Sequence, residues 1–391
     1  MLALKGIRVV ALEHAVAAPL CTRYLADLGA DVIKIERVGD GDFARGYDDY
    51  VKGQSSYFVW LNRGKRSMTL DIKHPDAHDV LARLTARADV VVQNLAPGAA
   101  SRLGLSYPAL NAMNPRVIVA DISGYGEGGP YEHRKAYDML VQAESGVVSV
   151  TGTESEPTRV GLSIVDMATG MYAYSGVLAA LLSRGRTGAG SNVKVAMFDA
   201  MAEWMAHPLY RHGYAGSLVE RMALKHPVIT PYGAYAAADG EVVFSIQNER
   251  EWANFCREIL GRPELATDER FHNNTARRNH AQEVKRLIEE SFAGRASRDV
   301  VDHLERTGIA NARLNNAGDL WEHPQLSERD RWREVGSPAG PIRALLPPVN
   351  SSLGEAVMGD VPGLGQHTDE VLSEIGFTGP QIASMRSRGV I

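Results

Sequence analysis

The chain has 391 residues, of which 45% are hydrophobic and 23% are charged, a composition typical of a globular protein with one large or two medium domains. Its formal net charge of −5 gives no indication of a nucleic-acid partner. The two cysteines, Cys21 and Cys256, lie far apart in apolar surroundings. This pattern favours buried thiols over a disulfide or a metal pair, and it fits a reducing, cytoplasmic location.

The N-terminal run MLALKGIRVVALEH does not have the pattern of a signal peptide. Its apolar residues are interrupted by Lys5, Arg8 and Glu13, whereas a signal peptide has an uninterrupted apolar region. We find no later stretch of about 18 apolar residues of the kind that spans a membrane. We therefore expect no membrane partner.

The first elements in chain order predict a βαβ unit. Ile7–Leu12 is an apolar run of strand length, Pro19–Leu28 has helical spacing, and Asp31–Glu36 is a second strand. Further strands are predicted at Ser67–Leu70, Asp89–Gln93 and Val117–Ile122. Strands that alternate with helices form parallel sheets. The predicted fold class is therefore α/β, with a doubly wound, Rossmann-like parallel sheet.

A dinucleotide site of the Rossmann type is not supported by the glycine pattern. The first strand is followed by EHAVAAPL, which contains no glycine. Gly124, Gly126 and Gly129 have the G-x-G-x-x-G spacing, but a proline and a polar run follow them instead of a helix. The sequence therefore argues against nicotinamide binding.

A carboxylate stands where a long helical pattern begins. The apolar run Val160–Val165 is predicted as a strand that ends at Asp166, and the helical pattern follows at once. The unpaired N–H groups and the dipole of a helix start favour an ionised carboxylate. Aspartate is also a preferred N-cap residue, so Asp166 is a candidate both for a helix cap and for a catalytic group that stays charged.

From about Leu224 the pattern changes to short strands and separate helices. Two strand patterns flank Asp239-Gly240, which is typical of a hairpin turn. Helices are predicted at 249–260, 281–292 and 298–306. We interpret residues 1–223 as a large domain, 224–317 as a smaller α+β domain and 318–329 as a linker.

Several runs along the chain resemble the class III CoA-transferase family. They include GYGEGGPY, YDMLVQAESGVVSVTG and GLSIVDMATGMYA, and also LADLGADVIKIER near the start and LGQHTDEVLSEIGF near the end. The resemblance covers nearly the whole chain. It implies that residues 330–391 rejoin the large domain and that two chains interlock into a homodimer.

The resemblance also implies a reaction in which CoA moves from an acyl-CoA thioester to a free carboxylic acid. Asp166 would attack the thioester and form a mixed anhydride, after which the CoA thiolate returns to give an aspartyl-CoA thioester. The acyl-CoA and the acid are then the partners. No permanently bound cofactor and no metal are expected, since the coenzyme A thioester is itself a substrate.

Residues that bind CoA are implied by the same motifs. Arg37 would lie against the adenine, because a guanidinium can stack on a ring or pair with a phosphate. Val16 stands where some relatives carry glutamine, so a polar role at this position is in doubt. Without the resemblance, each of these residues is ordinary at a surface or in a core. The implied set is His14, Val16, Arg37, Leu70, Lys73, Asn94, Arg102, Lys135, Tyr137 and Met197.

Two alternatives remain open beside the transferase. Racemases of 2-methylacyl-CoA share the fold and use a histidine before an aspartate, where this chain has Tyr137 before Asp138; tyrosine, with a pKa near 10, is a poor base at neutral pH. The other alternative is a non-catalytic acyl-CoA-binding protein in which Asp166 is only a cap. For a transferase, we expect a small dicarboxylate such as succinate or mesaconate as the acid.

Overall fold

The structure, a computed structural model, describes residues 2–391 and consists of two compact units. The first unit comprises the chain up to residue 148 together with 159–217 and 330–391, and the second comprises 149–158 and 218–329. Residues 318–329, expected as a linker, lie in the second unit, where α15 (Ala317–Trp321) and α16 (Pro324–Ser327) form. Residues 149–158, which the sequence analysis placed in the large domain, also lie there.

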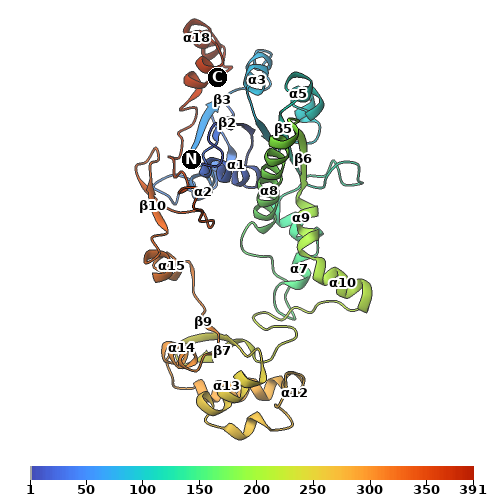
Figure 1. Cartoon of the computed structure of the whole chain (residues 1–391), viewed down its shortest axis with the longest axis vertical. Helices are drawn as coiled ribbons and strands as arrows, with labels where there is room; N and C mark the ends of the chain where they lie inside the picture. The colour runs from blue at the N-terminus through green and yellow to red at the C-terminus, as the bar shows by residue number, and fades with distance from the viewer. Residues whose placement is uncertain (1) are drawn as a thin grey trace. The chain divides into compact units, whose positions relative to one another are not determined.

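The first unit is built on a six-stranded parallel sheet (Figure 1). Its strands are β1 (Arg8–Leu12), β2 (Asp31–Glu36), β3 (Lys65–Thr69), β4 (Val90–Gln93), β5 (Ile118–Ser123) and β6 (Ser191–Ala196). The order is β3-β2-β1-β4-β5-β6, which is that of a doubly wound sheet and confirms the predicted α/β class. The order reverses between β1 and β4, the place where such sheets bind ligands.

Helices cover both faces of this sheet. Val9 and Ala11 of β1 pack with α1 (Ala17–Asp27) and α8 (Ile164–Thr187), while Val10 and Leu12 pack on the opposite face, because successive side chains of a strand alternate. The helices of that face are α3 (Ala77–Thr85), α5 (Tyr107–Met113), α17 (Thr368–Glu374) and α18 (Gly379–Ser387). The C-terminal segment thus completes the core of the first unit (Figure 1).

Shorter elements complete the first unit. They are a 3-10 helix (Phe43–Gly46), α2 (Ser56–Asn62), α4 (Ala99–Arg102), α6 (Asp138–Glu144), α9 (Met197–Trp204), α10 (Ala206–Ala215), and the antiparallel pair β10 (Trp332–Val335) and β11 (Ile342–Leu345). In the sequence, α7 (Val147–Val150) spans the boundary between the two units.

The long helix α8 packs closely against α1. By length and composition alone it could cross a membrane, which we did not expect from the sequence. Ala173 and Val177 are fully buried against the sheet and α1. A Cβ at Gly170 would come within 2.6 Å of the carbonyl oxygen of Ala17, so this glycine permits the close approach of α8 to the start of α1. Such packing is that of a core helix.

The predicted strand Val160–Val165 is wrong. This segment is irregular until α8 begins at Ile164, with Ser163 as the N-cap residue. A short apolar run does not distinguish a strand from the start of a buried helix. Val165 is fully buried in a cluster with Val141 and Met197. Asp166 is therefore the third residue of the helix and not its cap.

The second unit has a small antiparallel sheet covered by helices. The sheet consists of β7 (Tyr232–Ala237), β8 (Gly240–Ser245) and β9 (Asn311–Arg313). The helices are α11 (Glu249–Asn254), which continues as a π-helix to Ile259, a 3-10 turn at Pro263–Ala266, α12 (Asn274–Asn279), α13 (Ala281–Phe292) and α14 (Ser297–Arg306). The hairpin and the three predicted helices are confirmed. The core is rich in aromatic residues, with Phe244, Trp252, Phe255, Phe271 and Phe292.

Candidate active site

A cavity of about 2310 Å³ lies at the carboxyl ends of the sheet strands in the first unit. Residues that directly follow β1, β2, β4, β5 and β6 line it, as expected for ligand binding in an open parallel sheet. The cavity is lined by Asp166 and by nine of the ten residues implied for CoA: His14, Val16, Arg37, Leu70, Lys73, Asn94, Lys135, Tyr137 and Met197. Arg102 is exposed on α4 and is not part of the lining.

His14 and Asn94 join the two strands at which the sheet order reverses. The backbone N–H of His14 donates to Asn94 Oδ1 at 3.1 Å, and Asn94 Nδ2 donates to the carbonyl oxygen of His14 at 2.9 Å. The His14 ring contacts Phe43, with 5.0 Å between the ring centroids. Burial lowers the pKa of His14, so its imidazole is neutral at neutral pH and can accept a hydrogen bond.

Asp166 lies in the first turn of α8, and Asp138 of α6 supplies the cap of that helix. Asp138 Oδ1 accepts the backbone N–H of Val165 at 2.8 Å and that of Asp166 at 3.3 Å. Ser163, the N-cap residue, makes no capping bond with its side chain. Burial, and then the charge of Asp138, raise the pKa of Asp166 to about 7. The expectation that its surroundings favour the ionised form is therefore wrong, because burial and Asp138 disfavour a second charge.

Tyr47 is a cavity residue that the sequence analysis missed. Burial raises its pKa to about 12, with further contributions from the carboxylates of Asp42 and Asp166. These contributions indicate that the phenol lies near Asp166. Phe43 and Tyr57 pack on its ring, with centroid distances of 5.7 and 5.5 Å. The aromatic residues of the run FARGYDDY (residues 43–50) are the sequence feature that could have indicated this aromatic side of the cavity.

Four charged side chains are buried behind the loop that carries His14. Lys34 Nζ lies 2.8 Å from Asp42 Oδ2, and Lys65 Nζ lies 2.7 Å from Glu13 Oε1. Burial disfavours the charged form of Glu13, but Lys65 and Lys34 outweigh it and lower the pKa of this carboxyl. Burial also disfavours the charged form of Lys34, but Glu13 and Asp42 outweigh it and raise the pKa of this lysine. Burial lowers the pKa of Lys65 to about 8, which still leaves this lysine largely charged at neutral pH. The sequence signal for this cluster is Lys34 inside the apolar strand DVIKIE.

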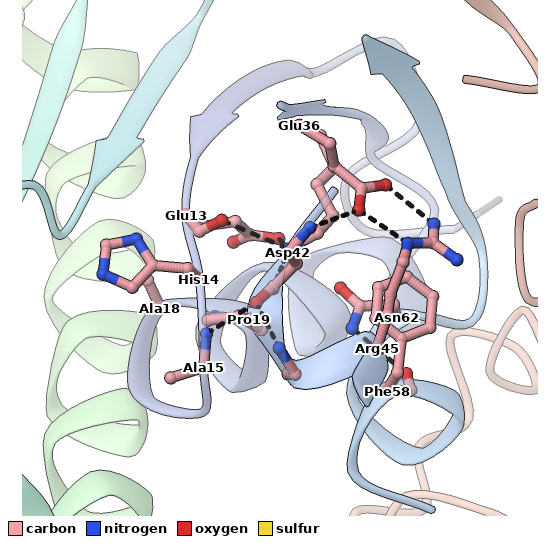
Figure 2. A network of polar contacts seen from close by, with 12 residues as sticks. Glu13, His14, Ala15, Ala18, Pro19, Glu36, Asp42, Arg45, Phe58 and Asn62 are labelled. Atoms are coloured by element: carbon pink, nitrogen blue, oxygen red, sulfur yellow. Dashed lines mark hydrogen bonds and ion pairs between the residues drawn. The ribbon is translucent and has the colours of Figure 1, made fainter. Parts of the chain in front are cut away.

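Glu36 ends β2 and is bound by protein groups. Its carboxylate accepts hydrogen bonds from Arg45 Nε and Nη2, both at 2.8 Å (Figure 2). It also accepts one from Ser67 Oγ at 2.6 Å. The backbone N–H of Asp42 donates to the same carboxylate at 3.0 Å. Burial disfavours the charged form of Glu36, but the hydrogen bonds from Arg45 outweigh it and lower the pKa of this carboxyl to about 2. A carboxylate with these partners is not free to accept a ribose hydroxyl, which agrees with the absence of a dinucleotide fingerprint.

Four cationic side chains on the cavity wall are available for an anionic ligand. They are Arg37, Lys73, Lys135 and Arg159. None of the four forms an ion pair with another residue of the part that the structure describes, residues 2–391. The same residues contain no group of three His, Cys, Asp or Glu side chains that could hold a metal ion. The site thus offers a partly buried carboxylate, cations for phosphates or carboxylates, and a large volume.

Comparisons with known proteins agree on one family. The model of CoA-transferase family III matches residues 4–368. The acetyl-CoA:oxalate CoA-transferase of Acetobacter aceti is 35% identical over 86% of this chain and 88% of its own. The succinyl-CoA:mesaconate CoA-transferase of Haloarcula hispanica is 33% identical over 96% of each chain.

A solved structure has the same fold over nearly the full length. The crystal structure of a CaiB/BaiF family protein from Brucella suis superposes with a TM-score of 0.86 at 32% identity, and it covers 95% of this chain and 99% of that one. The resemblance inferred from the sequence motifs is thereby confirmed. The chain belongs to CoA-transferase family III and is a CoA-transferase.

Proposed function

We propose that this enzyme transfers CoA from an acyl-CoA thioester to a small dicarboxylate, such as succinate or mesaconate, through a covalent intermediate on Asp166. The observation that carries the proposal is the position of Asp166. Its carboxylate lines the same cavity as nine of the ten residues implied for CoA. It is also poorly solvated there, with a pKa of about 7, and a poorly solvated carboxylate is a stronger nucleophile above that pH.

In the proposed reaction, each step exchanges one acyl bond for another. Asp166 attacks the thioester carbon, the C–S bond breaks, and CoA leaves as the thiolate while a mixed anhydride remains. The thiolate attacks the carbonyl carbon of Asp166, so the donor acid leaves as a carboxylate and an aspartyl-CoA thioester remains. The acceptor carboxylate attacks that thioester and releases the thiolate. The thiolate then attacks the acceptor carbonyl, which gives the new acyl-CoA and the free Asp166 carboxylate. Since energy is retained in each acyl bond, no other co-reactant is needed.

The size and charge of the cavity support a CoA thioester together with a second acid. Its volume of about 2310 Å³ exceeds the roughly 300–1,000 Å³ of a usual small-molecule pocket. Arg37 and Lys73 follow β2 and β3, where the CoA nucleotide is expected, and they would pair with phosphates. Lys135 and Arg159 lie in segments nearer in sequence to Asp138 and Asp166, and they are suited to a carboxylate. The names of relatives with succinyl-CoA and mesaconate support the dicarboxylate class.

We also propose that the enzyme is a homodimer, as the family resemblance implies. Large apolar side chains are exposed on α9 and α10: Trp204, Leu209, Tyr210 and Tyr214 have exposed fractions of 52, 54, 65 and 88%. Apolar groups gathered in this way are typical of a surface that a partner covers. Light scattering of the purified protein should give twice the chain mass of 42.5 kDa.

The test is an incubation in D₂O with a panel of acyl-CoA donors and pooled acids, including succinate, glutarate, mesaconate and oxalate, followed by mass spectrometry of the thioesters. We expect a new acyl-CoA that forms only when both donor and acceptor are present. Asp166→Asn should lose transfer by roughly 10³-fold or more, with the fold intact. Asp302→Asn is the matched control, since Asp302 is exposed on α14 outside the cavity.

Two other results would replace the proposal. Deuterium at the α-carbon with an unchanged acyl group would show a racemase, and binding of CoA without any turnover would show a non-catalytic acyl-CoA-binding protein. Transfer to oxalate and to no other acid would support the proposed transfer reaction but contradict succinate or mesaconate as the acceptor. Wild-type rates in Asp166→Asn would exclude the covalent intermediate at this residue.

A further inference from the structure

The loop between β1 and α1 has a backbone conformation that alanine does not favour. Ala15 has a φ of 63°, in the left-handed region where a Cβ is crowded. Its neighbours His14 and Val16 line the cavity, and Val16 packs in one apolar cluster with Met167, the residue after Asp166. Strained backbone of this kind persists only where surrounding groups hold it, and it concentrates at functional sites.

Asp42 is the group that holds Ala15. Its Oδ1 atom accepts the backbone N–H of Ala15 at 3.1 Å (Figure 2). The same atom accepts the backbone N–H of Ala44 at 2.9 Å. Its Oδ2 atom accepts Lys34 Nζ at 2.8 Å. Asp42 is only 4% exposed. Water therefore does not compete for these bonds, which are stronger in such surroundings than at a surface.

The other buried charges fix the orientation of Asp42. Lys34 is fully buried, and its ammonium also donates to the carbonyl oxygen of Glu13 at 3.3 Å. Glu13 directly precedes His14, so the same lysine contacts the loop on one side and Asp42 on the other. The backbone N–H of Asp42 donates to the Glu36 carboxylate (Figure 2). Arg45 donates to the same carboxylate. Each oxygen of the Asp42 carboxylate thus has a defined partner.

We propose that Asp42 is a positioning residue: its buried carboxylate holds Ala15 in the left-handed conformation and so fixes His14 and Val16 on the cavity wall near Asp166. Figure 2 shows the His14 ring directed away from Glu36 and Arg45, while the backbone of the loop faces Asp42. The proposal rests on the transfer reaction proposed for Asp166. The alternative is that Asp42 only neutralises Lys34 and stabilises the fold.

A double-mutant cycle between Asp42 and Ala15 separates these two roles. Asp42→Ala should lower kcat/KM by about tenfold or more, because Ala15 is released from a conformation it disfavours by a factor of roughly five to thirty. Glycine accepts this conformation at no steric cost. In the Ala15→Gly background, Asp42→Ala should therefore cost roughly fivefold less than in the wild type. If Asp42 only neutralises Lys34, its loss costs the same factor in both backgrounds, because independent effects add.

Two controls complete the cycle. Lys52→Gly makes the same kind of change at another residue with positive φ, 54°, outside the cavity lining; it should give no rescue of Asp42→Ala. Asp42→Asn keeps an oxygen for the N–H groups of Ala15 and Ala44 but lacks the charge that faces Lys34. It should lower the melting temperature while it retains more activity than Asp42→Ala. The reverse ranking would contradict the positioning role.

The double-mutant cycle still tests the positioning role if a variant is unstable or if the enzyme catalyses a reaction other than the proposed transfer. Without Asp42, Lys34 loses its shorter ion pair and keeps the longer one with Glu13, at 3.4 Å. Should Asp42→Ala fail to fold for this reason, Lys34→Met is added to remove the buried ammonium, and the cycle is repeated in that background. Binding of CoA is measured by calorimetry in every variant beside the transfer rate. An inactive wild type that binds CoA refutes the proposed function. An active wild type with additive Asp42 and Ala15 effects refutes only the positioning role.

Discussion

The carboxylate of Asp138 accepts a hydrogen bond from the backbone N–H of Asp166 at 3.3 Å, so one acid caps the helix whose first turn carries the other. The cap stabilises the start of α8, but it also brings a negative charge close to Asp166. Burial and this charge together raise the pKa of Asp166 to about 7. At neutral pH the ionised form of Asp166 is therefore only partly populated, and it is higher in free energy than the charge of an exposed carboxylate.

The first prediction concerns the pH dependence of transfer. In the reaction proposed above only the ionised form of Asp166 attacks the thioester, so kcat/KM, which reports the pKa of the free enzyme, should rise with pH through about 7 and level off above it. The measurement is kcat/KM for the acyl-CoA from pH 5.5 to 9. A rate that is constant over this range would show that Asp166 is ionised throughout or does not take part.

Asp138 provides the second prediction. Asp138→Asn keeps a carbonyl oxygen for the two N–H groups of α8 and removes the charge, so the inflection of the pH profile should move to lower pH. Asp138→Ala also removes the cap and should lower the free energy of unfolding by about 1 kcal/mol. Comparison of the two variants separates the charge from the cap. An inflection that stays in place in Asp138→Asn would assign the raised pKa to burial alone.

The third prediction concerns stability. A carboxyl whose pKa is raised in the folded state binds its proton more tightly there than in the unfolded chain. Its contribution to stability is thus lost as the pH rises from about 4, its value in an unfolded chain, to about 7. Asp166→Asn carries no such charge. It should be more stable than the wild type at pH 8, by on the order of 2 kcal/mol, with little difference at pH 4. Urea titrations at the two pH values measure this, and Asp302→Asn, at an exposed residue of α14, should show no such pH-dependent difference.

Gly170 gives the fourth prediction. It lies one helical turn after Asp166, on the same face of α8, and a Cβ there would come within 2.6 Å of the Ala17 carbonyl oxygen. Gly170→Ala should push α8 away from α1 and destabilise the fold by about 1–3 kcal/mol. It should also lower kcat, since Asp166 moves with the helix. Gly185→Ala is the matched control, because its Cβ would meet nothing within 4 Å and alanine favours a helix. Equal stability of the two variants would contradict the close contact.

The thiols give the fifth prediction. Cys21 and Cys256 are both buried and free, as the sequence predicts. Burial raises the pKa of Cys21 and raises that of Cys256 to about 12, so neither forms a reactive thiolate near neutral pH. Neither should react with a thiol reagent in the native protein, and both should react in denaturant. Rapid labelling of either one in the native state would show that its unit opens.

Much of the fold could be predicted from local patterns. Five of the six strands of the parallel sheet lie within about two residues of the predicted bounds, because most of them, unlike β3, are near-continuous apolar runs. The hairpin around Asp239 and the helix at 281–292 also follow from local signals. The error at Val160–Val165 has a local origin too, since a short apolar run fits both a strand and the start of a buried helix.

The sequence by itself determined the α/β class, the family and Asp166 as the candidate nucleophile, because these depend on periodicity and on short motifs. Only the tertiary structure decided how Asp166 is tuned and how the loop beside it is held. Asp138 lies 28 residues before Asp166, and Asp42 reaches Ala15 across 27 residues. Such pairs come together only when the sheet and its helices pack. A hydrogen bond or a pKa depends on distance in space and on burial, and neither can be read from spacing along the chain.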